Sequence, residues 1–477
     1  METWGADLGG RLLAESNLLC RPVADLKYMD AAGVDRLSDL TDCLLHAILS
    51  RLKARQVVQT CVLSSRWRRL WLAVPCLDID GGEDQVGEDE ERHNKLDDFV
   101  DNLLLRRSTC ASSPLQTLRV SIASPRPLRM RVLHERRYSV CDAHTRWVRR
   151  GLKSSPAVLE VRGVKLPSLS SGAHRITRLL LDDVILHGDF EKHLFSRLTL
   201  LQDLAIRNTD MSEISRIESN TLKNLTVEAG NILNFEVIAP RLASLHLAVQ
   251  FRGLRDFSVT VQEAPNLVHA SVRLLDNPLP AKGYPFVFQQ DASLLLPMLC
   301  RFLASLSNVR SLELSGFSDM AQHTSPPPSP GVPWPAGYQF ELMVPGSDKS
   351  APCPTLQPIL DEEHNGLPMF RNLRTLVLEQ CEIGDNIQTL CSFLHNTPAL
   401  EKLTLKNCEC QKVPSSSASN ILEMGFMTSS LSLVQIQYDD RDDHEGQGTR
   451  QVDNVVSMVE KNMPVTAMIH VTKVRKN

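Results

Sequence analysis

Few side chains in this 477-residue chain stand at a spacing that supports chemistry of their own. His187 and His193 flank Asp189, and zinc accepts imidazole and carboxylate ligands. A spacing of six residues on a loop or short helix is not a recognised ligand geometry, so we interpret both as surface histidines. The sequence has no phosphate-binding Gly-rich loop, no His-Glu-x-x-His and no nucleophile elbow. We therefore expect no catalytic residue, no cofactor, no metal site and no enzymatic activity.

The twelve cysteines give no pairing pattern either. No CxxC occurs, and the close pair Cys408 and Cys410 ends a leucine-rich stretch, which favours reduced thiols in the nucleus or cytoplasm. Residues 1–20 lack an apolar signal segment, and no run of 18 apolar residues appears. We therefore expect neither secretion nor a membrane partner.

Charge is nearly balanced, with 52 Lys and Arg against 56 Asp and Glu, so nothing draws the chain toward nucleic acid. The segment 126–150 is locally basic, and a nucleic-acid surface is one interpretation. Because it carries no aromatic stacking platform, a solvated helix face or loop is the preferred one.

A compact helical hook follows a leader that we expect to be flexible over residues 1–33. Residues 34–80 begin with three side chains that can cap a helix: Asp39, Thr41 and Asp42. Three short helices are then predicted, and Pro75 ends the last. Their apolar positions are Leu44, Leu45, Ile48, Leu49 and Leu52, then Val57, Val58, Val62 and Leu63, then Trp67, Leu70 and Trp71.

This hook has more apolar surface than about 45 residues can bury, since domains of that size are marginal on their own. Each large side chain left in water forgoes roughly 1.5–3 kcal/mol. Either a partner protein covers the surplus or the rest of the chain does, and periodicity alone leaves both open.

The residues of the hook resemble the F-box family. Leu-x-x-x-Leu-Leu-x-x-Ile-Leu from Leu40 and Ser-x-Arg-Trp-x-x-Leu-Trp from Ser64 stand at the family's spacing. Thr41 replaces the usual proline, and Ser65 stands where a basic residue is common. The exit from Val74 resembles that of plant F-box proteins with leucine-rich repeats.

The resemblance implies a Skp-type adaptor as partner, and through it a cullin-RING ligase. The adaptor contacts it implies are Leu37, Leu40, Leu44, Ile48, Leu52, Val58, Leu63 and Trp67.

A repeated pattern follows an acidic linker predicted at residues 81–94. The template Leu-x-x-Leu-x-Leu, allowing Val, Ile or Ala, predicts a leucine-rich-repeat array over residues 95–410. Four of its steps are 20–25 residues, and the step of 42 residues suggests a degenerate unit after Leu267. The matches begin at Leu115, Ile176, Leu201, Leu222, Leu242, Leu267, Val309, Leu373 and Leu400.

In such a repeat the leucines face a common core, and the Cys that ends a unit turns inward to satisfy backbone groups at the bend. This accounts for Cys381 and Cys408 without metal. Helices are predicted in some gaps, and a Pro-rich insertion spans residues 319–358. Three helical stripes support this interpretation: Leu96, Phe99, Val100, Leu103 and Leu104, then Trp147, Val148 and Leu152, then Leu390, Phe393 and Leu394.

Residues 411–477 depart from the repeat, with strands predicted at 431–436 and 465–471 and a helix between them. Such a segment suits the cap that an array needs, and it resembles the plant FBD module. The predicted fold class is therefore α/β: a three-helix F-box, an irregular leucine-rich-repeat solenoid and a C-terminal α/β cap.

The outward strand positions are the candidates for substrate contact, and their mixed signs favour a protein ligand. They are Arg178, Asp203, Arg207, Glu228, His246, His269, Arg273, Glu313, Lys402 and Lys406.

Three functions fit the sequence. The first is a substrate-recognition subunit of an SCF-type ubiquitin ligase, the second a non-ligase repeat scaffold with a vestigial F-box. The third is an enzyme whose site assembles from distant residues, although no motif points to one.

Overall fold

The computed structural model describes the helical hook and most repeat strands. The described residues are 37, 39–81, 90–110, 114–122, 138–169, 171–186, 188–211, 214–229, 234–250, 258–262, 264–275, 301–315, 368–380, 394, 396–408, 430–439, 455–456, 459 and 467–474. The predicted leader, the Pro-rich insertion and most of the acidic linker lie outside them. The chain divides into two compact units, Met1–Ala173 and His174–Asn477.

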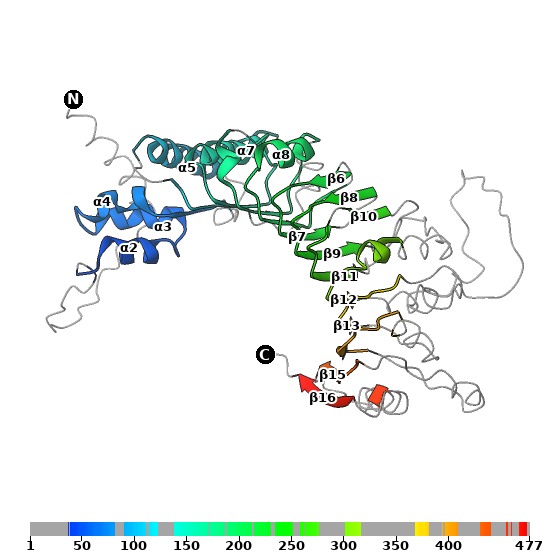
Figure 1. Cartoon of the computed structure of the whole chain (residues 1–477). Helices are drawn as coiled ribbons and strands as arrows, with labels where there is room; N and C mark the ends of the chain where they lie inside the picture. Colours follow the sequence, from blue (N-terminus) through cyan, green and yellow to red (C-terminus); the bar gives the residue numbers. More distant parts are fainter. Residues whose placement is uncertain are drawn as a thin grey trace, which may run out of the picture. The chain divides into compact units, whose positions relative to one another are not determined.

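The hook forms the start of the first unit, as the sequence predicts. Its elements are α2 (Asp42–Leu49), α3 (Ala54–Gln59), the 3₁₀ turn η1 (Thr60–Val62), α4 (Trp67–Leu70) and η2 (Trp71–Ala73) (Figure 1). The chain leaves it directly into β1 (Cys76–Asp80), the first of three parallel strands. The sheet therefore begins inside the range that the sequence assigns to the F-box.

Two helices accompany the parallel strands of this unit. The strands β1, β2 (Thr117–Ser121) and β3 (Val158–Arg162) pair in that order. The helices α5 (Glu90–Cys110) and α7 (Tyr138–Gly151), which continues into η3 (Leu152–Ser154), pack against one another (Figure 1). Helix α5 begins at Glu90, so the last five residues of the predicted linker are helical.

The predicted apolar stripes form the contacts of these helices. Leu96, Val100, Leu103 and Leu104 are buried on α5, as are Trp147 and Val148 on α7 and Leu152 after it. Phe99 is half-buried. Of the third stripe, Leu394 is buried, whereas Leu390 and Phe393 lie outside the described residues.

The second unit is built on a parallel sheet, after the 3₁₀ turn η4 (Ser171–Arg175) at the division. Its strands pair in the order β4 (Arg178–Asp182), β5 (Asp203–Arg207), β7 (Asn224–Ala229), β9 (Ser244–Gln250), β11 (His269–Leu275), β12 (Ser311–Ser315), β13 (Thr375–Glu379), β14 (Lys402–Lys406), β15 (Leu433–Asp439) and β16 (Met468–Val474). Helix α8 (Phe190–Arg197) lies between β4 and β5 in the chain.

Every template match in the sequence becomes one of the parallel strands, starting two residues after the first leucine of the match. The second template position of each strand is at most 3% exposed, so the leucines line a common core. In β4 to β15 these residues are Leu179, Leu204, Leu225, Leu245, Ala270, Leu312, Leu376, Leu403 and Val434. At roughly 1.5–3 kcal/mol for each buried leucine, this row is a main source of stability.

The degenerate unit predicted after Leu267 is wrong. β11 pairs directly with β12, His269 opposite Ser311, so no strand stands between them in the sheet. Residues 276–300, between these two strands in the chain, lie outside the described residues.

A second, three-stranded parallel sheet was not predicted. It consists of β6 (Arg216–Glu218), β8 (Asn234–Ile238) and β10 (Ser258–Gln262), in the order β10-β8-β6. Each of these strands precedes one of β7, β9 and β11 in the chain, where the short repeat spacing leaves room for an extended segment rather than a helix. Its inner side is apolar and buried, and is formed by Ile217, Phe235, Val237 and Val259.

A left-handed residue follows several strands of the main sheets. Gly163, Asp183, Asn208, Gln380 and Asn407 have φ between 48° and 66°. In four of them the backbone N–H donates to a carbonyl of the next strand in the sheet, for example Asn407 to Gln437 O at 2.9 Å and Gln380 to Lys406 O at 2.8 Å. This conformation ends the strand and turns the chain away from the sheet.

The residue after this turn points inward, as predicted for the repeat-ending cysteines. Cys408 Sγ donates to Leu378 O at 3.3 Å, and Thr209 Oγ1 occupies the same place after β5, donating to Arg207 O. The prediction is confirmed for Cys408, whereas Cys381 lies outside the described residues.

Candidate functional site

The hook closes a small core of its own. Leu45 and Leu49 of α2 pack with Val57 of α3 and with Trp67 and Leu70 of α4, and Val74 completes the cluster. Leu40, Leu52 and Trp71 pack against this cluster while remaining partly exposed. The inner face of each short helix is therefore satisfied within the hook.

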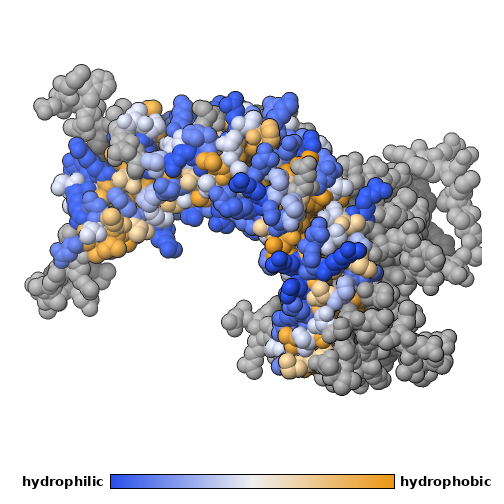
Figure 2. All heavy atoms as spheres, viewed as in Figure 1, coloured by the Kyte–Doolittle hydropathy of each residue, from blue (hydrophilic) through white to orange (hydrophobic). Residues whose placement is uncertain are grey.

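The outer face of the hook is also apolar. Leu44 and Ile48, four residues apart on α2, are 53% and 44% exposed, next to the buried Leu45 and Leu49. Leu37 is 50% exposed, and Val62 and Leu63 after α3 are 63% and 59% exposed. We call Leu37, Leu44, Ile48, Val62 and Leu63 the apolar hook surface. Figure 2 shows apolar side chains gathered over α2.

The start of α2 has no side-chain cap, and Arg66, the residue before α4, bonds to it instead. Thr41 is the N-cap residue but its side chain makes no capping hydrogen bond, contrary to the prediction. Arg66 Nη2 instead donates to Leu40 O at 2.6 Å and to Asp42 Oδ1 at 2.6 Å. The φ of Thr41, −67°, is the value that proline imposes. Asp42, also predicted to cap, is engaged by Arg66.

Two contacts fix the hook to the strands and helix that follow it. Lys53 Nζ lies 3.2 Å from Asp78 Oδ1 and 3.1 Å from Asp80 Oδ2 on β1. Burial opposes the charge of Lys53, but Asp80 and Asp78 outweigh it and raise the pKa of Lys53. Arg107 of α5, 1% exposed, donates to Leu72 O at 2.8 Å, and burial lowers its pKa to about 10.

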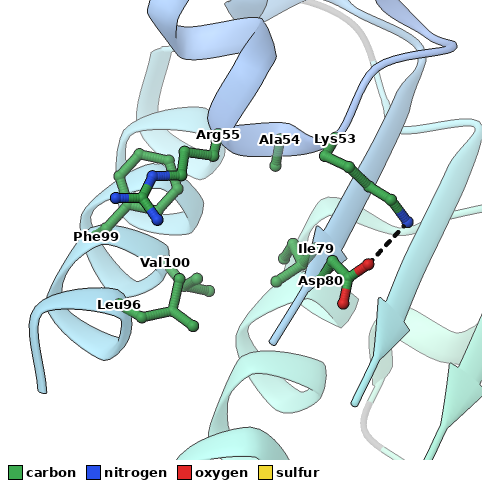
Figure 3. A pocket seen from close by; sticks show the side chains of 8 residues that line it. All are labelled: Lys53, Ala54, Arg55, Ile79, Asp80, Leu96, Phe99 and Val100. Carbon is green, nitrogen blue, oxygen red and sulfur yellow. Dashed lines mark ion pairs between the residues drawn. The ribbon is translucent and has the colours of Figure 1, made fainter. Parts of the chain in front are cut away.

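A small hollow lies beside this junction (Figure 3). Its volume of about 10 Å³ accommodates roughly one water molecule, so it is no ligand site. Figure 3 shows Lys53 paired with Asp80, and Arg55 and Phe99 among the other side chains that line the hollow. The lining residues are Lys53, Ala54, Arg55, Ile79, Asp80, Leu96, Phe99 and Val100.

The outward face of the second unit's sheet carries a second polar arrangement. Arg207 Nε lies 3.3 Å from Glu228 Oε1, and His246 Nε2 lies 3.8 Å from the same oxygen. Burial lowers the pKa of His246, opposed by Glu228 and supported by Arg273.

Two further ion pairs span this face. Arg273 Nη2 lies 3.3 Å from Glu379 Oε2, and Lys406 Nζ lies 3.4 Å from Glu313 Oε1. Five of the ten residues predicted to contact substrate thus pair with one another, and a sixth, Arg273, pairs with Glu379.

The comparisons with known proteins identify the hook. A family model described as the F-box domain matches residues 37–78. The protein MOF, a meiotic F-box protein of Oryza sativa subsp. japonica, is 30% identical over 403 residues, which cover 79% of this chain and 72% of the relative. This chain belongs to the plant F-box proteins with leucine-rich repeats and an FBD-like region. An FBD-associated F-box protein of Arabidopsis thaliana is 26% identical over 419 residues, 82% of this chain and 79% of that protein.

The predicted adaptor contacts of the F-box fall into three groups. Leu37, Leu44, Ile48 and Leu63 belong to the apolar hook surface, and Leu40, Leu52 and Val58 are half-buried. Trp67 is only 6% exposed and lies in the hook's core, so it can support binding only by holding the helices together. The sequence-based list of adaptor contacts missed Val62. In the structure both Val62 and its neighbour Leu63 face outward.

The remaining predicted substrate contacts lie in one row of the sheet. Arg178, Asp203, His269 and Lys402 each occupy the first position of their strand, Arg178 opposite Asp203. Asn224 Nδ2 donates to the carboxylate of Asp203. The contact of these residues with a substrate stays a prediction.

The basic segment before Arg150 is partly used within the first unit. Arg146 and Arg150 of α7 form ion pairs with Asp97 and Asp101 of α5, and Trp147 Nε1 donates to Asp97 Oδ1 at 2.6 Å. Burial raises the pKa of Asp101 despite Arg150. These pairs join α5 and α7, so Arg146 and Arg150 are engaged within the first unit.

Among the described residues, Cys43, Cys61, Cys76 and Cys408 are free thiols, and burial raises the pKa of Cys61 and of Cys76. No group of three or more His, Cys, Asp or Glu side chains in this part of the chain is arranged to hold a metal ion. His187 lies outside it. Within the described residues, no helix is long and apolar enough to span a membrane.

Proposed function

We propose that this chain is the substrate-recognition subunit of an SCF-type cullin-RING ubiquitin ligase. In this proposal the F-box binds a Skp-type adaptor, and the repeat sheet holds a protein substrate. The chain performs no catalysis itself. Ubiquitin transfer belongs to the RING subunit and its conjugating enzyme, and this chain contributes proximity.

The apolar hook surface is the observation that carries the proposal. Its five side chains remain between 44% and 63% exposed although the hook core is complete and β1 and α5 already pack on the hook. Covering such side chains contributes roughly 25 cal/mol for each Å² of apolar area removed from water. A partner protein supplies that cover in an F-box family, and the adaptor is the partner that the family implies.

We further infer that the repeat strands form one leucine-rich-repeat solenoid with residues 411–477 as its α/β cap. The in-register parallel pairing of β14, β15 and β16 and the buried Val455 and Val459 support this. The free thiols support a reducing compartment, the nucleus or the cytoplasm.

Affinity capture of the tagged chain from plant cells, with and without proteasome inhibition, tests the proposal. A ligase subunit is expected to co-purify adaptor and cullin, and to retain ubiquitinated partners that accumulate on inhibition. A Leu44→Asp, Ile48→Asp variant is the control that should lose adaptor, cullin and accumulation together. If the partners of wild type are stable and unaffected by inhibition, the chain is a repeat scaffold with a vestigial F-box.

A further inference from the structure

The polar residues of the second unit's sheet are divided unequally between its two edges. We call the residue before each strand and the first outward residue of each strand, from β4 to β14, the start edge. Neighbouring strands contact along it, since Lys223 Nζ lies 3.1 Å from Gln202 Oε1 and Arg374 pairs with Glu401. The start edge carries five basic side chains and two acidic ones, and the basic ones are Arg178, Lys223, Arg310, Arg374 and Lys402.

Within the described strands β4 to β14 and the residue before each, every acidic side chain is engaged by a donor. On the start edge, Asn224 donates to Asp203 and Arg374 pairs with Glu401. The four acidic residues at the outward positions further along the strands have donors too. Their donors are Asn208 for Asp182, Arg207 and His246 for Glu228, Lys406 for Glu313, and Arg273 for Glu379.

The basic side chains of β4 to β14 that have no carboxylate partner all lie on the start edge. Among the described residues, the side chains of Arg178, Arg310 and Lys402 have no hydrogen-bond or ion-pair partner, and the side chain of Lys223 bonds to the uncharged Gln202. All four belong to the start edge. Arg207, Arg273 and Lys406, the basic residues further along the strands, are instead each held by a carboxylate.

We propose that the start edge binds an acidic, extended segment of a protein substrate. A carboxylate there meets free guanidinium and ammonium donors, whereas a cationic segment on this sheet meets only carboxylates that already have partners. The inference rests on the proposed function, because it assigns a charge class to the substrate that the repeat sheet would hold.

The length of the edge sets the length of the segment. From Arg178 on β4 to Lys402 on β14 the sheet order counts seven strand spacings, which at about 4.8 Å each give roughly 34 Å. An extended chain covers about 3.4 Å per residue. The ligand segment is therefore about ten residues long, with its acidic residues separated by uncharged ones.

A protein suits this edge better than a nucleic acid does. The outward positions of β4 to β14 carry no Phe, Tyr or Trp on which bases stack. Asp203 and Glu401 interrupt the basic residues, and a continuous phosphate backbone would meet both. Spaced carboxylates avoid them.

The test uses the full chain purified with its adaptor and three fluorescent probes. These are a ten-residue peptide alternating Glu with Gly and Ser, the same peptide with Lys in place of Glu, and a ten-nucleotide single-stranded oligothymidylate. The variant Arg178→Gln, Arg310→Gln, Lys402→Gln removes three free charges of the start edge. The variant Lys192→Gln, Arg197→Gln, Arg301→Gln removes three exposed charges from other positions of the same unit.

Anisotropy titrations at low salt are expected to show the Glu peptide binding at least tenfold more tightly than the Lys peptide. The start-edge variant should weaken the Glu peptide roughly tenfold, as three exposed charge contacts allow, and the control variant less than twofold. Equal loss in both variants, or no preference for Glu, overturns the inference. Tighter binding of the oligothymidylate, lost in the start-edge variant, also overturns it. If adaptor still co-purifies in these cases, the proposed ligase function is unaffected.

Discussion

Arg66 Nη2 lies 2.6 Å from Asp42 Oδ1, across 24 residues of chain, and its second acceptor is the carbonyl of Leu40. Arg66 thus contacts the residues on both sides of Thr41, the position where F-box proteins usually have proline. Thr41 has no ring to fix its φ, yet its φ is the one that proline imposes. The contacts of Arg66 with Leu40 and Asp42 hold the backbone on both sides of it. This explains how the hook keeps a defined start of α2 without the proline.

The double variant Thr41→Pro, Arg66→Ala tests that explanation. Arg66→Ala should speed hydrogen exchange of the Leu44 and Leu45 amides, which bond to Thr41 O, roughly fivefold, as the loss of about 1 kcal/mol implies. Adding Thr41→Pro should restore most of the protection, since proline reduces the entropy of the unfolded chain by about 0.4–1 kcal/mol.

Exchange measured by mass spectrometry on the complex with adaptor compares the two variants. Arg69→Ala, an exposed arginine of α4 with no ion pair in the described part of the chain, is the matched control. If the double variant exchanges as fast as Arg66→Ala, then Arg66 does not act through the start of α2.

Trp67 gives a different prediction from the exposed leucines. Because it lies in the hook core, Trp67→Ala should destabilise the hook by about 3–5 kcal/mol. Adaptor binding is then lost through unfolding. Exchange protection of α2 and α3 should disappear in this variant, whereas Leu44→Asp should retain it. Intact protection in Trp67→Ala would place the side chain outside the core.

The left-handed residue after β13 predicts a stabilising substitution. Gln380 has φ 53°, which costs a residue with a side chain roughly 1–2 kcal/mol. Gln380→Gly should therefore raise the free energy of unfolding by up to about 1 kcal/mol after the entropy of glycine is deducted. Asn407→Gly should gain less, because asparagine tolerates this conformation. Urea titrations followed by circular dichroism compare both variants, and destabilisation by Gln380→Gly would contradict the assigned turn.

His246 makes the stability of the second unit depend on pH. Burial lowers its pKa, with Glu228 raising it, Arg273 lowering it, Glu313 raising it and Arg207 lowering it. Below the unfolded pKa near 6.5 the unfolded chain binds this proton more readily than the folded one, so stability falls as pH falls through that value toward the folded pKa.

His246→Gln should remove that component. Between pH 7.5 and pH 5, the variant is expected to lose less stability than the wild type. Thermal melts at both pH values measure it, and His269→Gln on an exposed position of β11 is the matched control. A larger acid loss in His246→Gln than in wild type would reverse the assigned sign.

The repeat strands were the part of the fold most open to prediction, because their leucines recur with one spacing and one orientation. Two strands escaped for local reasons. β3 has Pro156 where the first leucine of the template stands, and Val74, Leu77 and Ile79 of β1 fit the template but were assigned to the F-box exit. The second sheet escaped because its strands have three to five residues and no leucine template.

The site was harder to predict than the fold. Leu44 and Leu45 are both leucines on one helix, and only packing against Trp67 and Val57 decides that Leu45 is buried and Leu44 exposed. In the same way, outward strand positions could be named from the pattern, but which charges neutralise one another depends on the order of the strands. The periodicity of apolar residues predicts which face of a helix or strand is buried, but it does not predict which residues of other elements lie against that face.

Direct titration of purified Skp-type adaptor into the full chain tests the central claim, that the apolar hook surface is a docking surface. Leu44→Asp, Ile48→Asp should weaken binding by roughly a hundredfold or more, since charge is placed where apolar anchors are buried. The matched control is Leu105→Asp, a leucine of α5 that is 60% exposed outside the hook, and it should bind as wild type. If the folded double variant binds the adaptor as tightly as wild type, the hook surface is not the docking site and the account is contradicted.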